Sequence, residues 1–161
     1  MIFVDTGAFV ARYIRQDGHH RKARRAWAEI DRSPSRCFTS SFVLDETFTL
    51  LGRRSSYSFA ADRARALLRS EALTILRPDA DDEAKGVDLF AKFADQKVSF
   101  TDCISFVLMR RQRLERAAAV LGTGAGSRRR DHLDFVPVRV VHIKSAHATK
   151  HRVHAAAHLQ P

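Results

Sequence analysis

Short apolar runs alternate along the chain with stretches whose apolar residues recur at helical spacing. The runs are rich in β-branched and aromatic residues, which is typical of buried strands, and they cover residues 2–4, 37–39, 73–76, 117–121 and 136–143. Helices are expected between them at residues 8–14, 23–30, 42–51, 59–69, 79–93 and 104–109. This alternation predicts an α/β fold with a mainly parallel central sheet that helices cover on both faces.

Several residues mark where these elements begin and end. Thr6 and Gly7 are expected to turn the chain after the first strand, and Ser40 and Ser41 are cap candidates for the helix that starts at residue 42. Pro137 lies near the start of the last predicted strand, a position that edge strands tolerate.

The sequence changes character after residue 121. Residues 122–127 are glycine-rich, three arginines follow at residues 128–130, and residues 144–161 contain four of the eight histidines. A chain of 161 residues is long enough for one domain with a substantial core. We therefore expect one domain over residues 1–143 and a basic, histidine-rich, weakly ordered tail over residues 144–161.

The charge balance favours a polyanionic partner. The chain has 28 Lys and Arg against 18 Asp and Glu, a formal net charge of +10. Such a chain attracts nucleic acid through its phosphates. Solubility or contact with an acidic protein would also explain the charge.

Cysteine usage and hydropathy predict a cytoplasmic protein without a membrane segment. Cys37 and Cys103 lie in a predicted strand and a predicted helix, without zinc-site spacing, so both are expected to be reduced core thiols. No apolar run reaches transmembrane length, and no cationic segment leads into an apolar one as in a signal peptide.

Asp5 and Glu46 are the first two candidate functional residues. Asp5 ends the first strand just before a helix, where open α/β sheets place their ligands, although an N-cap would use the same residue type. Glu46 lies beside the apolar stripe of its helix, between Phe42 and Leu50, where a carboxylate is costly unless something compensates it. Asp45 looks like an ordinary surface acid.

Asp102 is the third candidate, because it follows Thr101 at the start of a helix. A first-turn acid that complements the helix dipole is the alternative interpretation. If the three acids converge, they cannot all stay ionised without a cation. Carboxylate oxygens that leave water on the metal suit Mg²⁺ or Mn²⁺. Such a site activates water and neutralises a phosphodiester during in-line attack.

Three segments carry a resemblance to a known family. MIFVDTGAF, SSFVLDETFTLLGRR and SFTDCISFVLMRR occur in the family's order and resemble the PIN-domain ribonucleases, in particular the VapC-type toxins of prokaryotic toxin–antitoxin pairs. The resemblance covers roughly residues 1–117. It implies a three-layer α/β/α fold and a PIN-like nuclease domain over residues 1–143.

The resemblance also implies a site and partners. Asp5, Glu46 and Asp102 would hold the divalent metal, with the hydroxyl groups of Thr6 and Thr101 behind them. RNA would be the substrate, the protein would form homodimers, and a cognate antitoxin encoded alongside would inhibit it. Together with the residue-based analysis, this predicts a metal-dependent endoribonuclease.

The chain departs from the family pattern where a fourth acid is expected, after the strand at residues 117–121. Gly122-Thr123-Gly124 stands there, and the nearest acids are Asp131 and Asp134. Either Asp131 reaches the site from a longer loop, or the site has three acids and reduced activity, or the coding sequence is altered after about Arg116. The alternative function is therefore a cleavage-impaired PIN-fold module that binds RNA or a partner.

Overall fold

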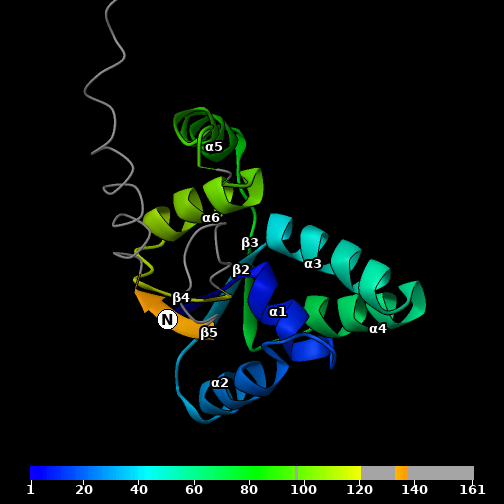
Figure 1. Cartoon of the computed structure of the whole chain (residues 1–161). Helices are drawn as coiled ribbons and strands as arrows, with labels where there is room; N and C mark the ends of the chain where they lie inside the picture. The colour runs from blue at the N-terminus through cyan, green and yellow to red at the C-terminus, as the bar shows by residue number, and fades with distance from the viewer. Residues whose placement is uncertain (97, 121–132, 138–161) are drawn as a thin grey trace, which may run out of the picture.

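A five-stranded sheet forms the centre of the protein (Figure 1), in a computed structural model that describes residues 1–96, 98–120 and 133–137. The strand order is β3-β2-β1-β4-β5. The first four strands run parallel and β5 is antiparallel to β4. The predicted mainly parallel sheet is confirmed, and its strands are β1 (Ile2–Val4), β2 (Cys37–Ser40), β3 (Leu73–Leu76), β4 (Arg116–Val120) and β5 (Leu133–Pro137).

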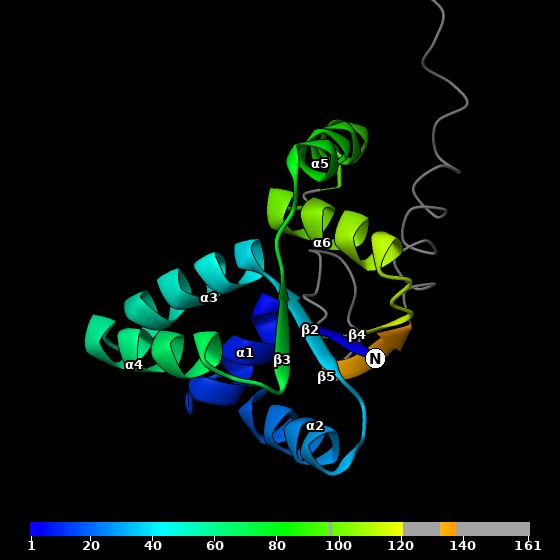
Figure 2. The ribbon, with the colours of Figure 1, turned by 180° about the vertical axis from the view of Figure 1, so that it is seen from behind.

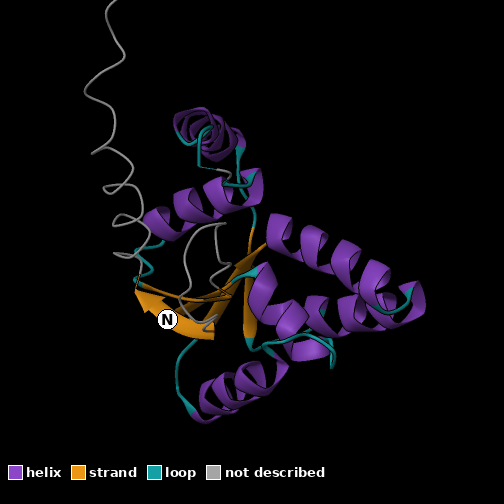
Figure 3. Cartoon of the chain, viewed as in Figure 1, coloured by secondary structure: helices purple, strands orange, loops and turns teal. Residues whose placement is uncertain are grey.

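Helices cover both faces of this sheet (Figure 3). Figures 1 and 2 show α5 and α6 together on one side and α1 to α4 on the other, as right-handed crossovers between parallel strands require. The predicted three-layer α/β/α arrangement is therefore confirmed. The helices are α1 (Thr6–Tyr13), α2 (His20–Arg32), α3 (Ser41–Arg54), α4 (Tyr57–Leu68), α5 (Ala80–Lys92) and α6 (Phe100–Arg111).

The core is built around β1, whose three residues are all buried. Helix α2 adds Ala23, Trp27 and Ile30 to the same core. The Trp27 ring lies 5.6 Å from the Phe9 ring, and its Nε1 donates to the Ala8 carbonyl at 3.3 Å. The indole therefore joins the second helix to the first, directly behind the end of β1.

The first helix begins earlier than predicted. Thr6 and Gly7 form its first turn instead of a separate turn before residue 8. Asp5 is extended, with φ −93° and ψ 164°, and its carbonyl accepts from the Ala8 amide at 3.1 Å. Because this extended residue already takes the N-cap position, the helix starts directly after it.

The last described strand also differs from the prediction. β5 runs from Leu133 to Pro137, so Pro137 ends the strand and does not lie near its start. It is opposite Arg116, the first residue of β4. Proline has no amide hydrogen to donate, which suits the end of a ladder. The rest of the predicted strand and the tail at residues 144–161 lie outside the described residues.

Cys37 and Cys103 are buried and free, as expected of core thiols. Burial raises the pKa of both thiols above its ordinary value. None of the helices in the described ranges is both long and apolar enough to span a membrane.

An ion pair between a buried acid and an exposed arginine joins the start of α5 to the end of α6. Asp82 is only 3% exposed, and its carboxylate accepts from the Arg111 guanidinium. Arg111 also donates to Asp79 at 3.2 Å and to the Arg77 carbonyl at 3.3 Å. One arginine thus holds the first turn of α5 against α6.

Arg111→Met is expected to lower the free energy of unfolding by about 3 kcal/mol, because it leaves the buried Asp82 charge without its partner. Urea denaturation measures this change. Arg110→Met is the matched control, since Arg110 is an exposed arginine in the same turn, and a surface change there should shift the value by less than about 0.5 kcal/mol. Equal effects of the two substitutions would contradict a structural role for this pair.

Candidate active site

Two acids from separate elements, Glu46 and Asp102, lie within electrostatic range of Asp5 at the carboxyl end of β1. Asp5 follows β1 directly, Glu46 lies in the second turn of α3, and Asp102 lies in the first turn of α6. β1 and β2 are parallel neighbours, so the segments that follow them leave the same edge of the sheet. The negative charges of Asp102 and Glu46 both raise the pKa of Asp5, which puts each of these two acids within electrostatic range of Asp5.

Asp5 is the most perturbed of the three. Burial, followed by the charge of Asp102 and then that of Glu46, raises its pKa from 3.8 to about 7, while the amides of Thr6 and Gly7 partly oppose this rise. Asp5 occupies the N-cap position of α1, but its side chain makes no cap hydrogen bond. The capping interpretation therefore does not account for the carboxyl group.

Neighbouring strands fix the backbone at Asp5. Its amide donates to the Ala118 carbonyl on β4 at 3.0 Å. On the other side, the buried Thr39 hydroxyl on β2 donates to the Val4 carbonyl at 2.9 Å. Sequence analysis missed Thr39, whose only signal was a hydroxyl residue in a buried strand. The end of β1 is thus held from both sides, which fixes where Asp5 presents its oxygens.

Thr6 supplies the compensation that Glu46 needs beside the apolar stripe of α3. Its hydroxyl donates to Glu46 Oε2 at 2.7 Å. Thr6 is buried at 6% exposure and Glu46 is half-buried, so the bond is shielded from solvent. The hydroxyl of Thr6 therefore lies behind an acid, where the family resemblance places it, and Asp45 is exposed as predicted.

Asp102 has a capping role as well as its place among the acids. Its Oδ2 accepts from the Ser99 amide at 3.0 Å and from the Ser99 hydroxyl at 2.9 Å, and Ser99 Oγ accepts from the Asp102 amide at 3.1 Å. This reciprocal capping box uses Oδ2 and leaves Oδ1 outside these bonds. Sequence analysis missed Ser99, although its Ser-x-x-Asp spacing is the signature of such a box.

Two predicted positions stay predictions. The hydrogen bond that involves Thr101 uses its carbonyl, which accepts from Ser105 Oγ at 2.8 Å. Asp131 lies outside the described residues. Asp134 lies in β5, opposite Ala119 on β4.

The donor chemistry of the three acids fits a divalent cation. Carboxylate oxygens are hard ligands of the kind that Mg²⁺ and Mn²⁺ prefer. Their mutual repulsion, visible in the raised pKa of Asp5, is the kind of penalty that a cation removes. As placed here, no three His, Cys, Asp or Glu side chains of the described chain are close enough together to enclose one ion.

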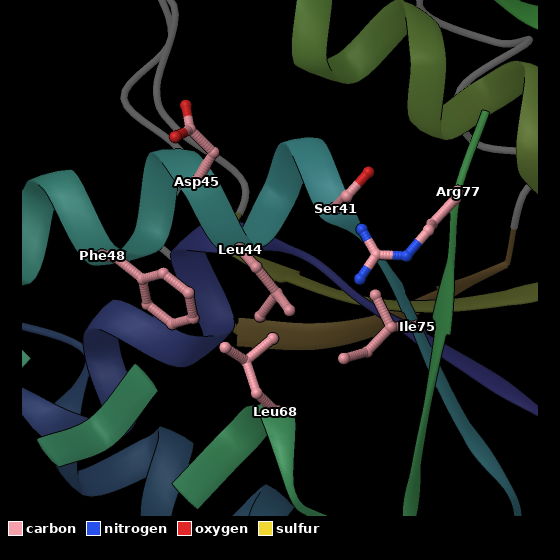
Figure 4. A pocket seen from close by; sticks show the side chains of 7 residues that line it. All are labelled: Ser41, Leu44, Asp45, Phe48, Leu68, Ile75 and Arg77. Carbon is pink, nitrogen blue, oxygen red and sulfur yellow. The ribbon is translucent and has the colours of Figure 1, made fainter. Parts of the chain in front are cut away.

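A separate hollow of about 190 Å³ lies beside the edge strand β3. Figure 4 shows Leu44, Leu68 and Ile75 pointing toward one another there, while Asp45 points away. None of the three acids lines this hollow, so it is distinct from the carboxylate cluster. Its lining residues are Ser41, Leu44, Asp45, Phe48, Leu68, Ile75 and Arg77.

Known proteins are similar to this chain in both sequence and fold. The PIN domain family matches residues 2–121. The 23S rRNA-specific endonuclease VapC20 of Mycobacterium tuberculosis is 35% identical over 122 residues, which cover 76% of this chain and 90% of that protein. A VapC ribonuclease of Archaeoglobus fulgidus is 30% identical over 115 residues, covering 70% and 72%.

A crystal structure of Mycobacterium tuberculosis VapC20, a sarcin-ricin loop cleaving toxin, matches with a TM-score of 0.70 at 32% identity. The match covers 82% of this chain and 100% of that one. The chain therefore belongs to the PIN-domain family. Within that family it belongs with the VapC-type ribonucleases.

Proposed function

We propose that this protein is a metal-dependent endoribonuclease, the toxin of a toxin–antitoxin pair, and that Asp5, Glu46 and Asp102 hold its Mg²⁺ or Mn²⁺. The observation that carries this proposal is the place of Asp5, directly after the parallel strand β1, where Glu46 and Asp102 are near enough for their charges to raise its pKa. Such a cluster at the carboxyl end of a parallel strand is where this fold class places ligands. The basic chain, at +10, suits a polyanionic substrate.

Each group has a distinct task in this mechanism. A bound divalent ion lowers the pKa of its water and neutralises charge on the scissile phosphodiester. Asp5 must lose its carboxyl proton to serve as a ligand. The Thr6 hydroxyl orients Glu46, and Ser99 orients Asp102 through its Oδ2. The positive net charge of the chain would attract RNA, and the three acids would hold the metal that cleaves it.

The relatives indicate which partners to test. Because VapC20 is a 23S rRNA-specific endonuclease, ribosomal RNA is the first substrate to offer. We also propose that the protein acts in the cytoplasm, forms a homodimer, and is inhibited by a cognate antitoxin protein. Thr101 would support Asp102, and Asp131 would be the fourth acid if its loop reaches the cluster.

A cleavage-impaired binding module is the second candidate. The observation that favours it is the sequence Leu121-Gly122-Thr123-Gly124 after β4, where the family pattern has an acid. Such a protein would bind RNA through its basic surface without cutting it.

One experiment separates the two candidates. The purified full chain is incubated with intact ribosomal RNA in Mn²⁺, in Mg²⁺ or in EDTA, and fragment ends are mapped by primer extension. The endonuclease should give discrete ends with either metal and none in EDTA. RNA that is shifted on a native gel but stays intact in both metals would establish the binding module instead.

Thr6→Val is expected to lower cleavage or metal affinity by about 10- to 100-fold, the range seen when a group that orients a metal ligand is removed. Valine keeps the volume but removes the donor to Glu46. Titration of Mn²⁺ measures the metal concentration that gives half-maximal cleavage. Thr6→Ser keeps the hydroxyl and should behave like the wild type, whereas equal losses in both variants would show that packing is responsible.

A further inference from the structure

Helix α2 carries the largest positive charge of the described helices. It contains five lysines and arginines against two acids, a net charge of +3. None of the other helices in the described ranges exceeds +1, and α5, with two lysines and four acids, is negative. Three of the ten net positive charges of the chain therefore lie on this one helix.

Three arginines form a row on the outer side of α2. Arg21, Arg25 and Arg32 are separated by four and seven residues, which places them on one face of a helix. Each is two residues from one of the three buried residues of α2, or about 200° around the helix axis. All three arginines are exposed. The row therefore lies on the side of α2 that faces away from the core.

The row has no counter-charge among the residues that the structure describes. None of the ion pairs between those residues uses Arg21, Arg25 or Arg32. Arg21 also lies in the first turn of α2, where the helix dipole disfavours a cation, and no acid in that turn offsets it. This placement is unfavourable for the helix itself, and it suits an anion from outside the chain.

We propose that this arginine row binds phosphates of RNA at a second place, apart from the three acids. The inference rests on the RNA substrate of the proposed function and adds a binding surface to it. From Arg21 to Arg32 the helix rises about 16 Å, which is long enough to meet several successive phosphates of one strand. Contacts of this kind position a nucleic acid without reading its sequence.

The chemistry of this face favours RNA over a protein partner. The centre of a protein interface is apolar or aromatic. The large apolar side chains that the described chain exposes belong to other elements and are Met1, Tyr57, Leu68, Val87 and Phe90. Between Arg25 and Arg32, the outer face of α2 has only the small side chain of Ala28. Exposed arginines without large apolar neighbours are what contact with a phosphate backbone requires.

Helix α2 lies on the other side of the protein from Asp102. In Figures 1 and 2, α6, whose first turn contains Asp102, is above the sheet, and α2 is below it. Trp27 is buried and bonded to the Ala8 carbonyl, which holds α2 in this place. A short RNA strand bound at the acids therefore does not extend to the row, whereas a long folded RNA can contact both.

Binding of intact ribosomal RNA in EDTA, where a metal-dependent reaction cannot proceed, tests this surface directly. Arg21→Gln, Arg25→Gln and Arg32→Gln combined should weaken binding on the order of 100-fold at about 0.1 M salt. The slope of log affinity against log salt should become shallower by about two to three, because each lost phosphate contact removes roughly 0.7 to 0.9. Filter binding over a range of salt concentrations measures both changes.

Two control variants separate this face from net charge and from folding. Arg53→Gln, Arg69→Gln and Arg110→Gln combined remove the same charge from exposed arginines of other elements and should keep the wild-type slope. Arg→Lys changes at all three positions of the row keep the charge and should keep most of the binding. Circular dichroism melts check that each variant is folded. Equal losses in the two glutamine variants would overturn the proposal, because net charge alone would then explain the binding.

Cleavage in Mn²⁺ shows whether the row acts apart from the acids. With intact ribosomal RNA, the glutamine variant of the row should raise KM and leave kcat nearly unchanged. With a short oligonucleotide that spans the mapped cleavage site, both constants should equal those of the wild type. A lower kcat on the oligonucleotide would show that the substitutions disturb the acids, and would overturn the proposal.

The two measurements also separate this inference from the proposed function. Weaker RNA binding by the glutamine variant of the row, in a protein that cuts no RNA, would support the surface and refute the endonuclease. Cleavage by the wild type together with unchanged RNA binding by that variant would support the endonuclease and overturn the surface. An acidic protein would then be the partner to test for this face of α2.

Discussion

Asp5→Asn is expected to abolish RNA cleavage and, in the metal-free protein, to raise stability at neutral pH. The loss of cleavage should be on the order of 10³-fold or more, the size expected when an electrostatic group at the reacting centre is removed. The gain in stability follows from the pKa of Asp5, which burial and the neighbouring acids raise to about 7. Asparagine keeps the shape of the side chain but has no charge to bury.

The sign of the pH dependence follows from the direction of this shift. The folded protein binds the Asp5 proton more tightly than the unfolded chain does. The stability contributed by the protonated group is therefore fully present below pH 3.8 and is lost as the pH rises to about 7. Three pKa units correspond to an upper limit of about 4 kcal/mol. Because Asp5 is only half-buried, we expect about 2 kcal/mol.

Urea denaturation in EDTA measures this effect at pH 5 and at pH 8. The advantage of Asp5→Asn over the wild type should be larger at pH 8 than at pH 5. Added Mg²⁺ should then stabilise the wild type more than the variant, because only the wild type has all three carboxylates. A variant that is less stable than the wild type at pH 8 without metal would show that the carboxyl group serves the fold rather than a ligand.

Asp5 could be identified as a candidate because the ends of buried strands can be recognised in the sequence. Asp5 stands where a short apolar run stops, and in a parallel sheet such ends meet at one edge. Glu46 could also be identified as a candidate from the sequence. Its neighbours Phe42 and Leu50 place it beside the apolar stripe of its helix, where a carboxylate without a partner is unfavourable. The sequence alone did not show that the Thr6 hydroxyl donates to Glu46, because the two residues are 40 positions apart in the chain.

The remaining features depend on neighbours that a local pattern does not contain. The capping box at Ser99 needs the side-chain geometry of Asp102, whereas sequence analysis treated that acid as a metal-ligand candidate, with a helix-dipole role as the alternative. The start of β5 at Leu133 depends on its pairing with Val120 in the neighbouring strand.

Asp102→Asn is expected to abolish cleavage to a similar extent as Asp5→Asn but with little change in stability, because Asp102 has two roles that this substitution separates. The amide oxygen of asparagine can still accept from the Ser99 amide and hydroxyl, which now bond to Oδ2. The negative charge is lost, and with it the main repulsion on Asp5 after burial. NMR titration of the Asp5 carboxyl should therefore show a pKa below that of the wild type.

Two further variants complete this comparison. Asp102→Ala removes the acceptor as well as the charge, so it should lose cleavage and also about 1 kcal/mol of stability, the usual cost of a lost helix cap. Ser99→Ala removes the hydroxyl that orients Asp102 but keeps the carboxylate and the backbone amide that donates to it, so it should lose similar stability and much less cleavage than Asp102→Asn. If Asp102→Asn cleaves RNA while Ser99→Ala does not, the capped start of α6 is what activity requires, and Asp102 is not a metal ligand.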